Sequence, residues 1–333
     1  MNERRAVAAV LAGAGCIAAS AILTRLSGSS PGAAAVFRCL FALPVLAVLL
    51  PIERTRRPGA RLTVRGLWMI RVSGLLLALD LVLWTHAIEA VGTGLATVLG
   101  NLQVLIVGLL AGWLLHERLE RTLLVTLPMM VIGVALLGGL IGAHSYGAHP
   151  MLGVIYGALS SIAYAAFLLL LRHGMGAGQV GRTVQGGVVR TLFEATAGAL
   201  VGSVVLAAML GDFRVGPVWP ALGWLALLAV TSQVLGWLLI TASLPRLPAS
   251  LTSMLLLSQP VGALGLGMLV FDERPSVQQF YGVTLVLLGV LIAASGGRVG
   301  SLRVRVYALC AASSSCGSRR APAPSAARVS AGL

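Results

Sequence analysis

Residues 80–139 read DLVLWTHAIEAVGTGLATVLGNLQVLIVGLLAGWLLHERLERTLLVTLPMMVIGVALLGG, and a related stretch follows at 236–295, GWLLITASLPRLPASLTSMLLLSQPVGALGLGMLVFDERPSVQQFYGVTLVLLGVLIAAS. The two stretches align without a gap at an offset of 156 residues. Polar residues are rare in so apolar a sequence, so their matches carry more weight than matches between Leu and Val. Those matches indicate an internal duplication, and they include Thr85 with Thr241, Gln103 with Gln259, and Glu117-Arg118 with Glu273-Arg274.

The composition of the chain is that of a membrane protein. Hydrophobic residues make up 58% of the sequence and charged residues 10%, against about 25% charged residues in soluble domains. The apolar runs are about 17–25 residues long, the length of a membrane-spanning helix. Lipid offers no partner for unpaired backbone groups, and the ~10-residue alternation of a membrane β-barrel is absent. We therefore predict an all-α integral membrane protein.

The apolar runs predict ten transmembrane helices in two halves of five, 1–141 and 151–297. An odd number of spans in each half means that the second half enters the membrane inverted relative to the first. Inverted repeats are a hallmark of secondary transporters, which bind their substrates near the midplane between the halves. The predicted spans are 6–26, 33–50, 67–88, 93–115, 121–141, 151–171, 186–210, 219–241, 248–270 and 277–297.

The distribution of arginine predicts the orientation. All 24 basic residues are Arg. With the N-terminus inside, 18 of them lie in inner segments and three, Arg25, Arg214 and Arg274, in outer segments. This asymmetry predicts a multi-pass protein of the cell membrane with both termini cytoplasmic. The tail at 298–333 has no acidic residue and is predicted to be a disordered, basic, cytoplasmic segment.

The same distribution argues against nucleic-acid binding, although the formal net charge is +14. The four Cys have no metal-ligand spacing, so we expect neither a metal site nor a cofactor. The expected partners are the lipid bilayer and a small-molecule substrate. The sequence leaves open whether the protein is a monomer or a homodimer.

The order of these segments resembles the drug/metabolite transporter superfamily, specifically its EamA-type ten-helix members. The resemblance covers about residues 6–297 and rests on three segments. The likeness implies transport of amino acids, metabolites or drugs, often outward, by alternating access. Gln259-Pro260 carries the proline that the family commonly shows, which predicts a kink in the ninth helix, whereas Gln103-Val104 gives no such signal in the fourth. The segments are SSPGAAAVFRCLFALPVL (29–46), LQVLIVGLLAGWLLHERLERTLL (102–124) and LSQPVGALGLGMLVFDERPSVQQFYG (257–282).

Charged residues inside the predicted spans are candidates for function, because an intramembrane charge is costly and is usually paired or functional. Arg38 and Asp80 lie at similar depths, so an Arg38–Asp80 ion pair is predicted, either lining the substrate cavity or clasping two helices. Arg190 and Glu194 are four residues apart and can pair on one helix face. Glu194 and Asp80 are the alternative candidates for proton coupling.

Polar and aromatic residues in mid-span complete the predicted substrate site. Amides in hydrocarbon must face protein or water, and they can either grip a polar or zwitterionic substrate or only join helices. Glu117-Arg118 and Glu273-Arg274, at helix ends, are interpreted as structural groups that close a turn. The substrate-binding candidates are Arg38, Asp80, Trp84, Asn101, Gln103, Tyr164, Gln233, Trp237, Ser258 and Gln259.

The leading hypothesis is a secondary transporter, not an enzyme, that exports small metabolites, amino acids or drug-like compounds. A G-x-x-x-x-G-K-[ST] nucleotide loop requires Lys, which the chain lacks. Proton antiport, exchange and facilitated diffusion all remain open. Uptake of a metabolite is the close alternative to export. A membrane scaffold or an intramembrane enzyme is the alternative to a transporter.

Overall fold

The computed structural model describes residues 3–56, 62–106, 109, 121–140, 146–175, 187–212, 218–243, 247 and 255–293. Regular secondary structure within these ranges is helical, without a strand. The predicted tail at 298–333 and Glu117-Arg118 lie outside the described residues. The all-α prediction is confirmed for the described part of the chain.

Among the described residues, six helices are long and apolar enough to cross a membrane. They are α1 (Glu3–Leu26), α2 (Pro31–Arg56), α3 (Val64–Val91), α7 (Pro150–Gly174), α8 (Val188–Met209) and the continuous segment of α9 (Ala221–Leu228), η1 (Ala229–Gly236) and α10 (Trp237–Ser243). Each coincides with a predicted span.

Four shorter apolar helices lie at the other predicted spans. Each has fewer than 18 residues within the described part, so the count of ten membrane-spanning helices stays a prediction. They are Thr93–Ile106, which begins with α4 (Thr93–Gly100), Thr126–Leu137 within α6 (Arg121–Leu137), α12 (Ser258–Phe271) and Val277–Ala293.

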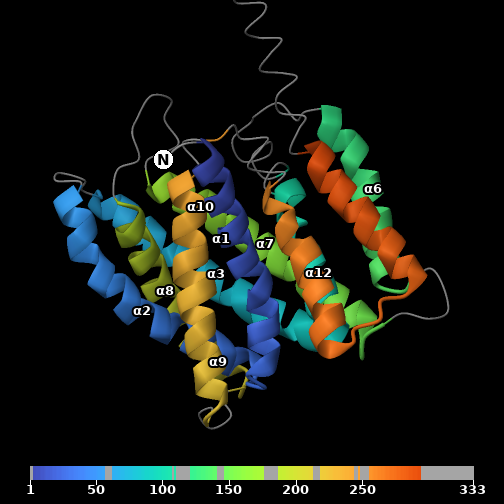
Figure 1. Cartoon of the computed structure of the whole chain (residues 1–333), viewed down its shortest axis with the longest axis horizontal. Coiled ribbons are helices and arrows are strands. Elements are labelled where there is room, and N and C mark those ends of the chain that lie inside the picture. The colour runs from blue at the N-terminus through green and yellow to red at the C-terminus, as the bar shows by residue number, and fades with distance from the viewer. Residues whose placement is uncertain are drawn as a thin grey trace, which may run out of the picture.

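α2 of the first half and α8 of the second half pair antiparallel, and their ends define two ends of the bundle. At the upper end in Figure 1, Glu53 near the end of α2 accepts hydrogen bonds from the first turn of α8. At the lower end, Asp212 just after α8 accepts one from Gly32 at the start of α2. The start of α1 and the end of Val277–Ala293 both lie at the upper end (Figure 1).

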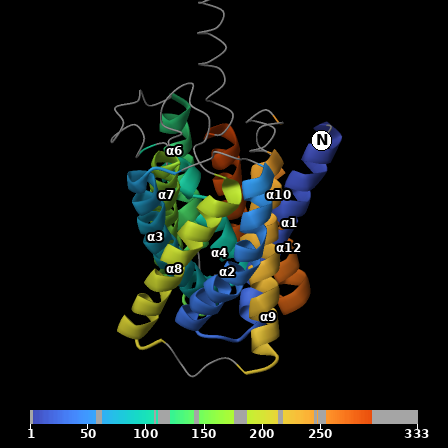
Figure 2. The same ribbon diagram turned by 90° about the vertical axis from the view of Figure 1, so that its left-hand side faces the viewer.

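The packing follows the duplication. α3 of the first half packs on α7 and α8 of the second half. Its counterpart in the second half, α9–η1–α10, packs on α1 and α2 of the first half. Other contacts between the halves show the same exchange: α2 with α8 and α4 with α12 are each their own counterpart, and α1 with α12 is the counterpart of α7 with α4. In Figure 2, α2 lies between α8 and α9. The packing therefore repeats between the two halves, as the predicted inversion requires.

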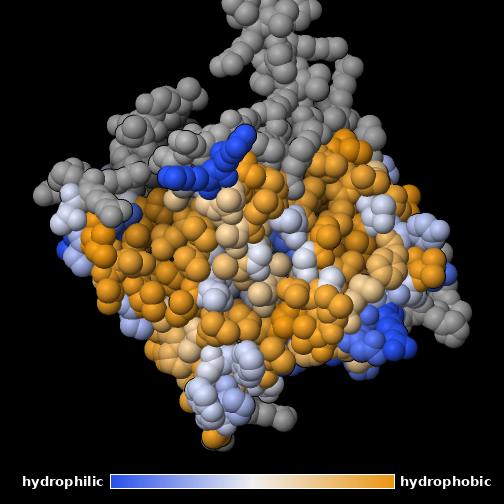
Figure 3. All heavy atoms as spheres, viewed as in Figure 1, coloured by the Kyte–Doolittle hydropathy of each residue, from blue (hydrophilic) through white to orange (hydrophobic). Residues whose placement is uncertain are grey.

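The outer surface of the bundle is apolar. Hydrophobic residues cover most of the face in Figure 3, and strongly hydrophilic ones gather at its margins. Large side chains such as Leu269 and Val204 are exposed, at 83% and 45%. Apolar patches of this extent are rare on soluble monomers and fit a surface in contact with lipid.

Glycines bring α3 and α8 into backbone contact. A Cβ at Gly198 would lie 2.1 Å from the carbonyl oxygen of Arg71, and one at Gly74 would lie 2.2 Å from that of Ala195. Small residues at helix interfaces permit such close approach in membranes. The two halves are thus joined by backbone packing that leaves no room for a side chain.

We predict that Gly198→Ala destabilises the protein, because the added methyl group must push α3 and α8 apart; overpacking of this kind costs about 1–3 kcal/mol. Gly15→Ala is the matched control, since a Cβ added at Gly15 would meet no atom within 4 Å. Thermal unfolding in detergent should show a lower midpoint for Gly198→Ala and no loss for Gly15→Ala. Equal midpoints would contradict the close approach.

Candidate functional site

Arg38 on α2 lies at the boundary between the halves and is only 8% exposed. Its Nε donates to Oε1 of Gln233 at 3.0 Å, and its Nη2 donates to the hydroxyl of Ser232 at 3.2 Å. Both acceptors belong to η1 in the second half. Gln233 in turn reaches the hydroxyl of Thr196 on α8 at 3.5 Å. Arg38 therefore connects the halves through neutral groups.

Asp80 on α3 is the second buried charge, at 9% exposure. Its Oδ1 accepts a hydrogen bond of 2.6 Å from the hydroxyl of Ser160 on α7. Asp80, Arg38 and Tyr164 also interact electrostatically. Residues from α2, α3, α7 and η1 thus form one buried polar centre, defined here as Arg38, Asp80, Ser160, Ser232 and Gln233.

The predicted direct ion pair between Arg38 and Asp80 is wrong. No carboxylate oxygen of the described residues lies within 4.0 Å of the Arg38 guanidinium. The physical reason is that each charged group is hydrogen-bonded to neutral residues of the other half, Arg38 to Gln233 and Ser232 and Asp80 to Ser160. The two charges share the centre without direct contact.

Aromatic side chains border the centre on one side. The ring of Tyr164 lies 5.5 Å from that of Phe167 and 6.5 Å from that of Trp237. Trp84 packs instead against the cluster that contains Leu95 and Met130. The structure therefore brings Tyr164 and Trp237 together and places Trp84 elsewhere.

The predicted mid-span amides lie at matching helix interruptions. Asn101 follows the end of α4 and donates its side-chain amide to the Thr97 carbonyl at 2.9 Å. Leu257, 156 residues later, interrupts the helix just before Ser258. This interruption lies next to Pro260, where a kink is predicted. The first half breaks at the equivalent place without a proline, where backbone bonds of Asn101 and Leu102 tighten to three-residue turns.

The remaining amide candidates are less engaged. The Ser258 hydroxyl donates to the Leu255 carbonyl at 2.6 Å, a local bond across the interruption at Leu257. The side-chain oxygen of Gln103 is buried without a hydrogen-bond partner in the described part of the chain. Gln259 is half-buried, and no side-chain bond of it joins the polar centre in the described residues. Their role in binding stays a prediction.

Glu194 pairs across helices and not along its own. Its Oε2 accepts a 2.8 Å hydrogen bond from Nε of Arg71 on α3. The predicted local pair with Arg190 is wrong, because the glycine contact brings Arg71 of α3 against this face of α8. Arg71 went unnoticed in the sequence, although it lies inside an apolar run, the same signal that singled out Arg38.

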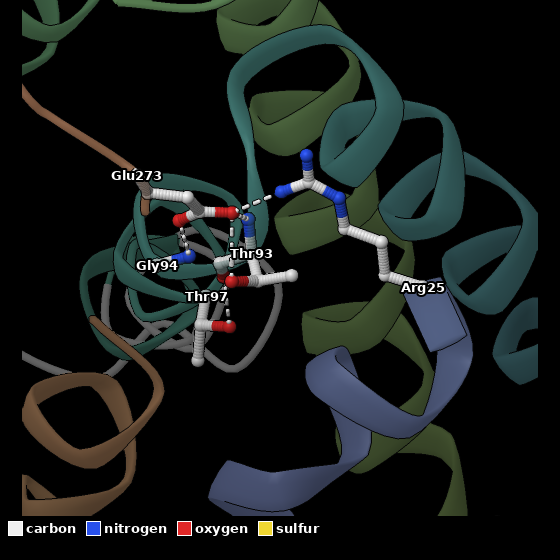
Figure 4. A network of polar contacts seen from close by, with 5 residues as sticks. All are labelled: Arg25, Thr93, Gly94, Thr97 and Glu273. Carbon is white, nitrogen blue, oxygen red and sulfur yellow. Dashed lines mark hydrogen bonds and ion pairs between the residues drawn. The ribbon is translucent and has the colours of Figure 1, made fainter. Parts of the chain in front are cut away.

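A second polar network, the Glu273 clasp, consists of Arg25, Thr93, Gly94 and Glu273 (Figure 4). The Glu273 carboxylate accepts from the backbone N–H groups of Thr93 at 2.7 Å and Gly94 at 3.2 Å, and from the Thr93 hydroxyl at 2.9 Å. Arg25 of α1 donates to the same carboxylate. The interpretation of Glu273 as a structural group agrees with this network, but its side chain caps α4 of the other half, whereas its backbone N–H closes its own turn by donating to the Gly267 carbonyl.

Glycine leaves room for this carboxylate. A Cβ at Gly267 would lie 2.4 Å from Oε2 of Glu273, and one at Gly92, whose φ is +90°, would lie 2.8 Å from Oε1. The sequence offered the duplicated Glu-Arg pair as a signal for Glu273. It offered none for Arg25 as the partner, since the two residues are 248 positions apart.

A pocket of about 350 Å³ opens beside the clasp at the lower end of the bundle. Thr24, Arg25, Thr85, Glu89, Gly92 and Tyr146 are among its lining residues. The described residues contain no group of three or more His, Cys, Asp or Glu that could hold a metal ion.

Comparison with solved structures supports the fold. One structure, described only as "Crystal structure of protein", is 16% identical, covers 86% of this chain and 96% of its own, and superposes with a TM-score of 0.53. At that identity the likeness shows the fold alone. No curated protein matches the chain.

Comparison with protein families gives a match over both halves. The EamA-like transporter family matches residues 4–139 and 151–295. Apart from the first residues of α1 and α7, these two segments contain every helix described above, and their ends at 139 and 295 coincide with the ends of the two aligned stretches. The chain belongs to the EamA-like transporter family.

Proposed function

We propose that this protein is a secondary transporter that exports small metabolites, amino acids or drug-like compounds across the cell membrane by alternating access. The family membership and the inverted packing support transport. The observation that carries the proposal is the buried polar centre at the boundary between the halves. A membrane scaffold has no need of a buried arginine and aspartate at that boundary, and burying each costs free energy.

Arg38 is the strongest candidate for substrate contact. A guanidinium has five N–H donors, and acceptors in the described residues engage its Nε and Nη2. Guanidinium groups bind carboxylates and phosphates through two parallel hydrogen bonds. A substrate with an anionic group would bind the Arg38 donors that have no acceptor among the described residues, and Asp80 would receive a cationic or hydroxyl group.

The π-helical segment η1 supports a binding role for this region. It spans Ala229–Gly236 in the middle of a membrane-spanning segment and carries both partners of Arg38. π-helical turns are rare and occur frequently at functional sites. Tyr164 and Trp237 would contact the apolar part of a substrate, while Trp84, Asn101, Gln103, Ser258 and Gln259 remain candidates along the path.

Asp80 is the preferred coupling residue. Glu194 is held by Arg71, whereas Asp80 has a single neutral hydrogen-bond donor, Ser160, in the described residues. Protonation of Asp80 breaks no direct ion pair among the described residues, whereas protonation of Glu194 would forfeit its ion pair with Arg71. Glu194 remains the alternative.

The direct test of transport uses proteoliposomes with a panel of labelled amino acids, organic anions, sugars and cationic drugs, with and without a pH gradient. We expect flux of at least one compound with an anionic group. Accumulation only toward the cytoplasmic face would identify uptake in place of export. Absence of flux for every compound would favour the scaffold.

We predict that Arg38→Gln lowers the transport rate at least tenfold and that Arg38→Lys restores only part of it. The loss follows from hydrogen bonds to a charged group, each worth about 1.5–3 kcal/mol, and Lys cannot reproduce the planar fork of Arg. Arg5→Gln is the matched control, because Arg5 is exposed at the start of α1. Initial rates in proteoliposomes measure the effect, and wild-type rates for Arg38→Gln would exclude substrate contact.

We predict that Asp80→Asn abolishes the response of transport to a pH gradient, because the amide cannot carry the proton. Glu194→Gln should keep that response, even where its folded yield falls. Flux measured across a series of pH gradients separates the two variants. If Asp80→Asn responds to pH as the wild type does, another group couples the proton.

We predict that both termini are cytoplasmic. The start of α1 and the end of Val277–Ala293 lie at one end of the bundle (Figure 1), and the arginine asymmetry assigns that end to the cytoplasm. Reporter enzymes that are active on only one side of the membrane, fused separately at each terminus, should give the same cytoplasmic signal. Opposite signals would overturn the topology.

A further inference from the structure

The Glu273 clasp joins three segments at the lower end of the bundle. Glu273 follows α12 in the second repeat, whereas Arg25 on α1 and Thr93 on α4 belong to the first. The Glu273 side chain is 1% exposed, and that of Arg25 is 37% exposed. Arg25 also lies 4.3 Å from the centroid of the Phe271 ring. The clasp therefore holds α1 and α4 against the end of α12.

Carboxylates bridge the repeats reciprocally at both ends. Asp212 of the second repeat binds the first turn of α2 at the lower end. Glu53 of the first repeat binds the first turn of α8 at the upper end, through Val189 and Arg190, both at 2.9 Å. Negative charge at a helix N-terminus is favourable. Any rocking of one repeat against the other must strain or break such contacts at the end that opens.

The pocket beside the clasp is lined in part by α3, the helix that also carries Asp80 of the buried polar centre. Arg25 and Gly92 form part of its wall, and Thr85 lies deeper on α3. Thr85 is five residues from Asp80, or about 7.5 Å along the helix at 1.5 Å per residue. Thr85 in the pocket wall is thus about one and a half helical turns from Asp80 of the centre, and the clasp lies at the boundary between the repeats.

The contact between Arg25 and Glu273 can break while the other contacts of the clasp remain. The guanidinium of Arg25 is partly in contact with solvent, so it can move into water with little loss of solvation. Glu273 would keep its three hydrogen bonds from Thr93 and Gly94, which hold the carboxylate in place for reclosure. A purely structural cap does not need an arginine from a third helix.

We propose that the Glu273 clasp is the latch of the lower gate, and that separation of Arg25 from Glu273 lets α1 part from α12 and opens the pocket to the polar centre. Glu273 acts as a positioning residue and does not contact the substrate. The latch rests on the proposed transport function, and the following experiment has one arm that does not require transport.

The first arm measures access between α1 and α12. Ala18 on α1 is 2% exposed, and a Cβ at Gly262 on α12 would lie 3.2 Å from the Cβ of Ala18. Ala18→Cys, in full-length protein whose four native cysteines are replaced by serine, is treated with a membrane-impermeant maleimide from the side of the lower end. Arg25→Gln and Glu273→Gln should each speed labelling at least tenfold.

Arg274→Gln is the matched control for this arm. Arg274 pairs with Asp272 in the same loop, where the two side chains are 79% and 76% exposed, so its loss removes one arginine without touching the clasp. Its labelling rate should equal that of the parent. If Arg25→Gln labels no faster than Arg274→Gln, the latch is overturned. Arg25→Gln decides the question even if Glu273→Gln does not fold, because Arg25→Gln leaves the hydrogen bonds of Glu273 to Thr93 and Gly94 intact.

The second arm locks the gate. In the double variant Ala18→Cys, Gly262→Cys, the Cβ atoms would start a few tenths of an ångström closer than the 3.5–4.5 Å typical of disulfides, so oxidation should tie α1 to α12. Oxidised protein should transport at least tenfold more slowly than the same protein after reduction. Equal rates would overturn the latch while leaving transport intact. No flux in any state would refute transport, and the labelling arm would still decide the latch.

Discussion

In a bilayer, the helix ends and charged groups of this chain must find partners within the protein or at its margins, because hydrocarbon offers none. The described carboxylates show how the chain meets this requirement. Glu53, Asp212 and Glu273 each bind the start of a helix from the opposite repeat. Because these helix starts find their partners on the opposite repeat, their hydrogen bonds stabilise the contact between the halves at both ends of the bundle.

Between those ends, small residues set the distance between helices. Gly74 and Gly198 allow the backbones of α3 and α8 to touch, and that approach in turn lets Arg71 reach Glu194. In membranes, van der Waals packing and interhelical hydrogen bonds replace the hydrophobic effect as the source of helix association. Backbone packing and the ion pair therefore support one another on the same interface.

The centre of the bundle follows a different rule from its ends. Arg38 and Asp80 are close enough to interact electrostatically but are bonded to neutral residues of the second repeat. Neutral partners hold a buried charge less tightly than a direct ion pair does, so these contacts can be exchanged for contacts with a solute. Carboxylates that bind helix starts at the ends, and charges held by neutral partners at the centre, fit the alternating access proposed above.

The sequence by itself determined the helical class and the duplication, because hydrophobic length and repeated polar residues can be identified without knowing which residues are in contact; the inversion, which follows from the parity of ten spans, stays a prediction. The sequence also singled out Arg38, Asp80 and Gln233 of the centre and Tyr164 beside it, since rare polar residues in apolar runs are visible without coordinates. Only the tertiary structure decided which residues pair with one another. Arg25 and Glu273, like Arg71 and Glu194, are far apart in the chain, and the close helix packing that brings them together depends on contacts that no local pattern specifies.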